Sequence, residues 1–542
     1  MKGRVAFVIL VLAAAGGAMA LRLPELPLRP MHCDEAVHAY KLGEMIEGGH
    51  HRYRYDPLEY HGPTMNYAAF AVARLRGITR YAQLDEFILR IVPVAFGVGL
   101  VLLLWGLDDG LGYPAAVCAA VLTALSACMV FYSRYFIMEV PLVFFTFLAI
   151  AGAWRYVRSG SAAWCAVAGA GVGLMHATKE TWVFVPVAMG FGLLVNLAWR
   201  RWVEGERPRR AGRVVNWRVA LAAGVAAAVA GVLLSSFLTN PAGAWDSILT
   251  YVHGLRRAGG GGGAEAGNLH VNPWDFYLRR LVYYRVGRGP IWTEALIVGL
   301  ALAGTVAGFA RRGLGRADAG LVRVLGVYSF ALLGIYSVVP YKTPWCVLGA
   351  LHGMILVAGV GAVALVRWVP TRPAKVIVAL LLAAGAGQLG WQAVRGSFKQ
   401  YDRPDNPWVY AQTLRDTVRL GRRADELAAL HPDGYDMRIN FISPDPHDQW
   451  PLPWYLRRFN RSRVGYWTEV PKDPDAPMLI FVPEVWEALE PRLKQKYEWE
   501  HRGLRPEIVL VVGTEMGLWK KYIEQIRAKM KAPARPPRPG GD

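Results

Sequence analysis

Two adjacent acids stand near the amino terminus, in residues 31–40, which read MHCDEAVHAY. Asp34 and Glu35 are flanked by His32 and His38, and the segment follows closely on the first apolar stretch. Charge beside a membrane span is costly unless a partner, a metal ion or a reaction uses it. We expect Asp34 to act as a general base in a water-poor pocket, with Glu35 orienting it or binding a sugar hydroxyl.

Two other interpretations of the acid pair stay open. Acids in the first turn of a helix complement its dipole, which needs no chemistry. His32 and His38 together with the carboxylates are also suitable ligands for a divalent metal ion. Their spacing matches no specific metal motif, so the sequence predicts no definite cofactor and leaves a divalent metal as an option.

Further charged residues stand at the ends of apolar stretches, in the segments FYSRYFIMEVP, ATKETW and VPYKTPWC. Ion pairs and interfacial lysine anchors would explain them without any substrate. Cations at that depth can also hold a lipid phosphate. A histidine in the turn HGP and basic residues of a long loop are weaker candidates. The expected catalytic acids are Asp34, Glu35 and Glu139, and the expected substrate-binding residues are His38, His61, Arg134, Lys179, Glu180, His253, Arg256, Tyr341 and Lys342.

The elements that must position these residues are membrane helices. The chain has 542 residues, of which 54% are hydrophobic, with mean hydropathy +0.23 and net charge +20. Its apolar residues form long runs almost without charge, which is typical of transmembrane helices. About eleven spans are predicted, at residues 5–20, 87–107, 113–132, 140–154, 164–177, 182–199, 219–238, 292–310, 321–339, 345–366 and 376–389.

The loop charges predict an orientation for these spans in the inner (plasma) membrane. Arginine and lysine gather in every second loop, which indicates cytoplasmic loops and a cytoplasmic amino terminus. The excess of basic residues is therefore attributed to membrane topology, and no nucleic-acid partner is expected. An odd number of spans places the carboxy-terminal part outside the cytoplasm, on the side of the acid pair and of a long loop at 239–291.

The predicted fold class is an α-helical polytopic membrane protein with a C-terminal soluble α/β domain. After residue 396 the chain alternates strand-like and helix-like segments, with strands at 437–443, 478–482 and 508–513 and helices at 408–430, 449–459, 484–494 and 519–530. We expect a transmembrane domain at 1–396, with its first outside loop at 21–86, an extracytoplasmic α/β domain at 397–531, and a disordered tail at 532–542.

The pattern resembles the GT-C membrane glycosyltransferases, especially those related to protein O-mannosyltransferases. The matching features are the DE pair, an acid after the third span and the soluble carboxy-terminal domain. More closely, HCDEAVHA, SRYFIMEVP, ATKETW, YKTPW and WPLPWYLR resemble the glycosyltransferase-like family described as flippase-activity-associated. The resemblance implies a lipid-phosphate-linked sugar donor and inverting transfer, with Asp34 as base and Glu139 as a second acid. The tail lacks a WWDYG-type motif and a repeated β-trefoil, which disfavours asparagine and serine acceptors.

The favoured function is thus an enzyme, a membrane glycosyltransferase that uses a polyprenyl-phosphate-linked sugar and works at the outer face. Its expected partners are that donor, an unknown acceptor (glycan, lipid or protein) and membrane lipids. The alternative is a lipid-linked oligosaccharide flippase, or a protein that assists one, without transferase activity. A third class is a receptor or scaffold built on the carboxy-terminal domain. A flippase needs charges along a path through the membrane, whereas the ionisable residues here collect at span ends, which favours the enzyme.

Overall fold

The computed structural model describes residues 2–49, 51–57, 61–206, 217–258 and 270–531. Its contacts divide the chain into two compact units. The membrane unit comprises Met1–Arg29, Gly48–Gly77 and Asp85–Tyr410, and the sheet unit comprises Pro30–Glu47, Ile78–Leu84 and Ala411–Asp542.

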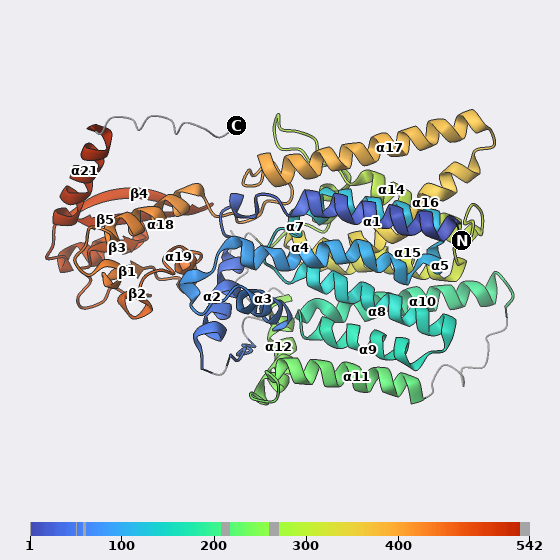
Figure 1. Ribbon diagram of the computed structural model, residues 1–542, viewed down its shortest axis with the longest axis horizontal. Helices are drawn as coiled ribbons and strands as arrows, with labels where there is room; N and C mark the ends of the chain where they lie inside the picture. The colour runs from blue at the N-terminus through green and yellow to red at the C-terminus, as the bar shows by residue number, and fades with distance from the viewer. Residues whose placement is uncertain (1, 50, 58–60, 207–216, 259–269, 532–542) are drawn as a thin grey trace. The chain divides into compact units, whose positions relative to one another are not determined.

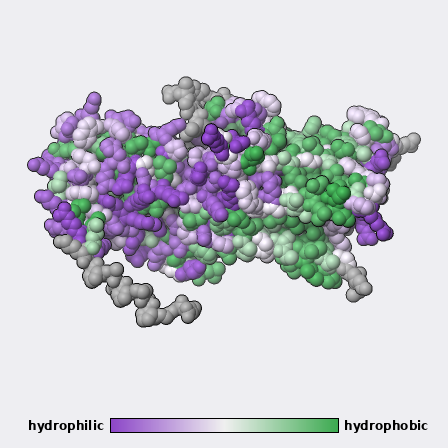
Figure 2. Space-filling view, turned by 90° about the horizontal axis from the view of Figure 1, so that it is seen from above, coloured by the Kyte–Doolittle hydropathy of each residue, from purple (hydrophilic) through white to green (hydrophobic). Residues whose placement is uncertain are grey.

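The membrane unit has a helix at each of the eleven predicted apolar runs (Figure 1). Within the described residues, eight helices are long and apolar enough to cross a membrane, and three apolar helices are shorter. Hydrophobic residues, green in Figure 2, cover much of the visible surface of this unit. The eleven helices are α1 (Lys2–Arg22), α4 (Glu86–Leu102), α6 (Tyr113–Leu125), α8 (Glu139–Ser159), α9 (Ala162–His176), α10 (Phe184–Trp202), α11 (Trp217–Leu234), α14 (Ala295–Ala310), α15 (Ala319–Val338), α16 (Leu348–Trp368) and α17 (Arg372–Val394).

Short helices occupy the connections, and one of them corrects a prediction. The run 113–132, expected as one span, is interrupted at Ser126, whose φ of −52° and ψ of 122° are not helical. The Ser126 side chain accepts a hydrogen bond from the backbone nitrogen of Met129, as an N-cap does, so a second helix starts there. The long loop at 239–291 likewise contains two helices. The short helices of this unit are α3 (Thr64–Leu75), α5 (Asp108–Leu111), α7 (Ala127–Tyr132), α12 (Ala242–Ala258) and α13 (Phe276–Val282).

Glycines allow two of the membrane helices, α14 and α16, to pack closely. A Cβ atom at Gly361 would overlap the carbonyl oxygen of Leu300, and one at Gly304 would overlap that of Val357. Small residues at helix crossings are the usual way for membrane helices to bring their backbones together, because dispersion contacts replace the missing hydrophobic drive.

The sheet unit contains a five-stranded sheet in the order β2-β1-β3-β5-β4. β1 is parallel to β2 and to β3, whereas β5 is antiparallel to both of its neighbours. In Figure 2 the surface of this unit is mainly hydrophilic. The elements are α2 (Cys33–Glu47), α18 (Arg415–Ala428), β1 (Ile439–Ile442), α19 (Leu452–Tyr455), β2 (Val464–Trp467), β3 (Met478–Phe481), α20 (Trp486–Leu489), β4 (Tyr497–Arg505), β5 (Ile508–Glu515) and α21 (Met516–Lys531).

The predicted α/β character holds, but several predicted elements of this unit were wrong. The strands β2 and β4 were not expected, because both are edge strands and carry polar or half-exposed residues instead of an apolar run. The helices expected at 449–459 and 484–494 are single short turns, since prolines interrupt both segments. The helix expected at 408–430 begins only at Arg415.

The helix α2 comes from the first loop of the chain but packs within the sheet unit. The segment before it is tied down at Met31: its backbone nitrogen donates to the Tyr455 hydroxyl at 2.9 Å, and its carbonyl accepts from the Thr413 hydroxyl at 2.6 Å. Pro30 accepts from the Gln412 amide at 3.2 Å. A single boundary at residue 396 does not capture this packing. Contacts between residues that are far apart in the chain place α2 in the same unit as the carboxy-terminal strands.

We expect the close α14–α16 crossing to be sensitive to a single methyl group. Gly361→Ala should lower the free energy of unfolding by about 1–3 kcal/mol, because the added atom pushes backbone against backbone. Thermal unfolding in detergent measures this. Gly299→Ala is the control, because nothing lies within 4 Å of a Cβ atom at that position on α14, the partner helix of the crossing. Equal thermal midpoints for the two variants would contradict the packing argument.

Candidate active site

The acid pair lies in the first turn of α2, and its two acids have different environments. The backbone nitrogen of His32 donates to Glu35 Oε2 at 3.0 Å, and the backbone nitrogen of Asp34 donates to His32 Nδ1 at 3.2 Å. This is the reciprocal arrangement of a capping box, with a histidine ring in the usual place of a serine or threonine. Glu35 is fully buried. Its side chain is therefore used to build the start of the helix.

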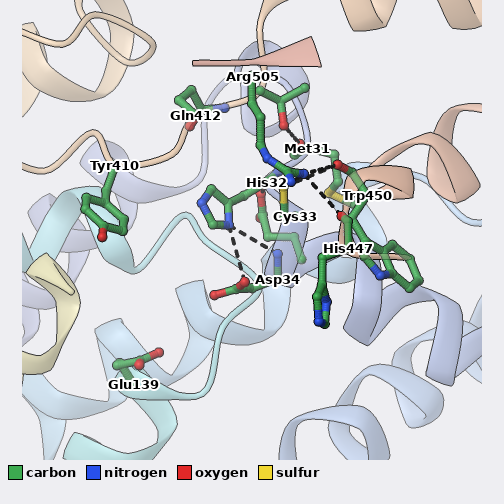
Figure 3. A network of polar contacts seen from close by, with 12 residues as sticks. Met31, His32, Cys33, Asp34, Glu139, Tyr410, Gln412, His447, Trp450 and Arg505 are labelled. Atoms are coloured by element: carbon green, nitrogen blue, oxygen red, sulfur yellow. Dashed lines mark hydrogen bonds and ion pairs between the residues drawn. The ribbon is translucent and has the colours of Figure 1, made fainter. Parts of the chain in front are cut away.

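The Asp34 carboxylate, in contrast, is accessible. Its side chain is 42% exposed and lies 3.9 Å from His32 Nδ1 (Figure 3). His38, one helical turn later on the same face, is buried. An accessible carboxylate at the positive end of a helix can receive a proton from a ligand, which the buried Glu35 cannot do without leaving its cap.

Cys33 begins α2 and is bound by the carboxy-terminal part of the sheet unit. Its thiol donates to the Trp450 carbonyl at 3.6 Å, and Arg505 Nη1 contacts its sulfur at 3.7 Å (Figure 3). Burial raises the pKa of the Cys33 thiol to about 11, so the sulfur stays protonated at neutral pH. Arg505 also pairs with Asp448 at 2.9 Å. Burial raises the pKa of Asp448, although the Ser443 hydroxyl and Arg505 both oppose that shift.

In the membrane unit, Glu139 and Lys179 form a buried ion pair. Glu139 is the first residue of α8, and Lys179 lies between α9 and the following short 3-10 turn. The side chains are 7% and 8% exposed, and the lysine Nζ donates to Glu139 Oε1. Burial lowers the pKa of Lys179, but the Glu139 carboxylate outweighs burial, and the net shift is upward. The ion-pair partner of Glu139 is thus Lys179 from the segment ATKETW.

A small cavity lies beside this ion pair. Most of the residues that line it are apolar, and the two charged residues are among them. This is the composition expected of a site for an apolar chain with a charged end. The lining residues are Glu139, Leu142, Val143, Thr146, Lys179, Thr181, Val185, Leu332, Tyr336, Trp345, Cys346, Leu348 and Gly349.

The HGP turn, which contains His61, contacts the backbone of Lys179, one member of the ion pair. His61 forms an isolated antiparallel bridge with Lys179, and its Nδ1 lies 3.6 Å from Glu180 Oε2. Gly62 is required here, because a Cβ atom would overlap the carbonyl oxygen of Ala177. The structure thus brings together His61, Lys179, Glu180 and Glu139, four of the predicted residues.

Two predicted cations are engaged by backbone carbonyls. Arg134 donates to the carbonyls of Arg22 at 2.8 Å and Pro24 at 2.6 Å, and burial lowers its pKa to about 9. Lys342 Nζ donates to the carbonyls of Asn272, at 3.0 Å, and Val339, and burial lowers its pKa. Lys342 is only 1% exposed, so it is no snorkelling anchor.

The remaining candidates lie away from these clusters or outside the description. Tyr341 pairs with Val271 through a backbone bridge and stacks on His270 at 4.5 Å. The side chains of His253 and Arg256, on α12, lie outside the described residues. Among the residues that the structure describes, no group of three or more histidine, cysteine, aspartate or glutamate side chains is arranged to hold a metal ion.

Arg505 and Asp448 were missed by reasoning from the sequence. Neither stands in a motif, and Arg505 lies more than 400 positions from the acid pair. The nearest signal in the sequence is the segment WPLPWYLR, which begins two positions after Asp448.

The fold has relatives among solved structures. Residues 73–237 match the family model described as dolichyl-phosphate-mannose-protein mannosyltransferase, and no curated protein matches the chain. ArnT from Cupriavidus metallidurans, bound to undecaprenyl phosphate, is 16% identical with a TM-score of 0.60, over 94% of this chain and 97% of ArnT. The oligosaccharyltransferase AglB from Archaeoglobus fulgidus, in complex with an inhibitory peptide and a dolichol-phosphate, is 14% identical with a TM-score of 0.54, over 89% of this chain and 70% of AglB. These similarities confirm the predicted fold class, a polytopic helical membrane protein with the fold of ArnT and a carboxy-terminal domain built on a mixed sheet.

The buried ion pair allows a test that separates packing from chemistry. Lys179→Met should cost about 3–5 kcal/mol of stability, because it leaves the Glu139 carboxylate buried without its partner. Glu139→Gln combined with Lys179→Met should recover most of that loss. Thermal unfolding of the single and double variants measures the coupling. A double variant no more stable than Lys179→Met would show that the two side chains are not coupled.

Proposed function

We propose that this chain is an integral-membrane glycosyltransferase that moves a sugar from a polyprenyl-phosphate-linked donor to an acceptor hydroxyl, with inversion at the anomeric carbon. Asp34 is the general base. The observation that carries the proposal is the contrast within the acid pair: Glu35 is consumed by the helix cap, whereas Asp34 presents an accessible carboxylate. Base catalysis needs one such group within hydrogen-bond reach of the proton it removes.

The reaction proceeds by a single displacement. The acceptor oxygen attacks the anomeric carbon as its proton passes to the Asp34 carboxylate. The bond between that carbon and the phosphate oxygen breaks, and the polyprenyl phosphate leaves with the electron pair. Asp34 then returns its proton to solvent. One carboxylate is sufficient for this scheme, because the phosphate leaves as a stable anion and needs no acid to protonate it.

The cavity of the membrane unit supports a lipid-linked donor. Its walls, from α8, α15 and α16, are mostly apolar, as a surface that contacts the first isoprene units of such a lipid would be. Lys179 supplies a cation for the phosphate, and Glu139 keeps that cation protonated and oriented. A preorganised cation stabilises the charge that develops on the departing phosphate.

The similar solved structures support the same donor class. The ArnT structure carries undecaprenyl phosphate and the AglB structure a dolichol-phosphate, and the matching family model is described by dolichyl-phosphate-mannose. A flippase of lipid-linked oligosaccharides is the alternative. It would move the donor between leaflets without breaking the sugar–phosphate bond, so product analysis distinguishes the two.

We expect Asp34→Asn to lower kcat for sugar transfer about 10²- to 10⁴-fold, because the amide cannot accept the proton. The assay follows labelled sugar from a panel of polyprenyl-phosphate hexoses, with purified protein in detergent. Asp433→Asn is the control, since Asp433 is an exposed acid of the same unit. Glu35→Gln should chiefly lower thermal stability. Normal transfer by Asp34→Asn would remove Asp34 from the base role.

We also propose a cytoplasmic amino terminus and an extracytoplasmic sheet unit, on the inner membrane. The support is the basic charge of alternate loops. A reporter enzyme that is active only outside the cytoplasm, fused after Gln400, should be active. The same reporter fused after Arg158, in a predicted cytoplasmic loop, should be inactive. The reverse pattern would overturn the orientation.

A further inference from the structure

We propose that Arg505 is a positioning residue, which holds the first turn of α2 so that the Asp34 carboxylate stands where it can take a proton. The inference rests on the proposed function, in which Asp34 is the base. It assigns a role to the hairpin at the edge of the sheet, far from the acid pair in sequence.

The Arg505 guanidinium joins three parts of the sheet unit (Figure 3). Nη1 donates to the carbonyls of Trp450 at 2.7 Å and His447 at 3.3 Å and contacts the sulfur of Cys33 at 3.7 Å. Nη2 donates to Asp448 Oδ1 at 2.9 Å. One side chain thus connects the loop after β1 with the residue that directly precedes Asp34.

The backbone of the hairpin directs Arg505 toward these partners. The register of β4 against β5 shifts between Gly503 and Arg505, and the strand ends there. Pro506 and Glu507 form the turn, and Glu507 has a φ of +73°, the conformation that the third residue of a type II turn needs. An irregularity in a strand beside a functional site commonly re-aims a side chain. Both irregularities lie directly beside Arg505, at the end of β4.

The ion pair that fixes Arg505 is shielded from solvent. The side chains of Arg505 and Asp448 are 16% and 14% exposed, and Asp448 also accepts from the Ser443 hydroxyl at 2.8 Å. A partly buried pair holds its geometry better than an exposed pair, because water and salt compete less for both groups.

The loop that Arg505 fixes also contacts α2 at a second point. The Trp450 ring meets the Tyr40 ring edge-on, with centroids 5.9 Å apart. Tyr40 lies seven residues after Cys33 and therefore on the same face of the helix. Two contacts on one face set both the position and the rotation of α2. A rotation error would carry Asp34 away from its substrate, and displacements near 1 Å can cost about 100-fold in rate.

The experiment compares two partly buried arginines of the same unit. Arg505→Gln should lower kcat for sugar transfer by about 10- to 100-fold and leave KM for the polyprenyl-phosphate donor unchanged. Arg505→Lys should recover part of the rate, because lysine keeps the charge but not the fork. Arg423→Gln is the matched control: Arg423 pairs with Glu500 at 2.6 Å and is 20% exposed. It should keep kcat near the wild-type value.

Two readouts separate positioning from general stability. In the Asp34→Asn background, Arg505→Gln should cause no further loss of kcat, because it acts through Asp34. In a background with Cys118, Cys128, Cys165 and Cys346 replaced by alanine, Arg505→Gln should speed maleimide labelling of Cys33, and Arg423→Gln should not. Asp448→Asn should behave like a mild Arg505→Gln, which keeps the test valid if the latter does not fold.

Normal kcat in folded Arg505→Gln, an equal loss in Arg423→Gln, or unchanged labelling of Cys33 would overturn the positioning role. These outcomes differ from failure of the proposed function, in which the wild type transfers no sugar or Asp34→Asn transfers normally. Labelling of Cys33 needs no donor, so it tests the contact of Arg505 with α2 even if the enzyme assay fails.

Discussion

Helix ends inside an apolar medium leave backbone groups without partners, and that constraint explains several of the buried charges among the described residues of the membrane unit. Arg22 donates to the carbonyls of Thr123, at 2.8 Å, and Ala124, at 2.9 Å, near the end of α6. Arg134 does the same for the end of α1, and Lys342 for the end of α15. At a helix start, Glu294 accepts from the backbone nitrogen of Cys128 at 2.9 Å.

This use of charge changes how the conspicuous polar residues are interpreted. A guanidinium or ammonium group bound to carbonyls is a structural cap, and Glu35 is likewise part of the cap of α2. Two features are not consumed in this way: the accessible Asp34 carboxylate of the sheet unit and the Glu139–Lys179 pair beside the cavity of the membrane unit. The proposed chemistry rests on these two features, because a reacting group must have capacity left for its substrate.

The role of the sheet unit follows from how α2 is held. A short helix in a loop has little stability of its own, because the free-energy cost of forming its first turn exceeds the stabilisation from its few hydrogen bonds. Contacts from Gln412, Thr413 and Tyr455 hold the segment before α2. The carboxy-terminal domain therefore serves as the scaffold of the candidate base, and changes in its sheet can reach the acid pair without touching it.

The sequence by itself determined the class of the protein and its membrane helices. Apolar runs predict spans because every backbone group in lipid must form its hydrogen bond within the segment, as a helix allows. This requirement is local, so each segment can be recognised without the others. It also singled out Asp34 and Glu35, since adjacent acids beside a span are conspicuous. It could not divide their roles, because the cap that buries Glu35 depends on the geometry of a single helical turn.

Only the tertiary structure decided which partners the charged residues take. Glu139 pairs with Lys179, forty positions away, and Arg134 with carbonyls more than a hundred positions away. Arg505 reaches Cys33 across 472 positions. The edge strands β2 and β4 also became visible only in the sheet, because edge strands need no apolar run. Ion pairs and hydrogen bonds act between surfaces that folding brings together, and no local pattern of residues records which surfaces those are.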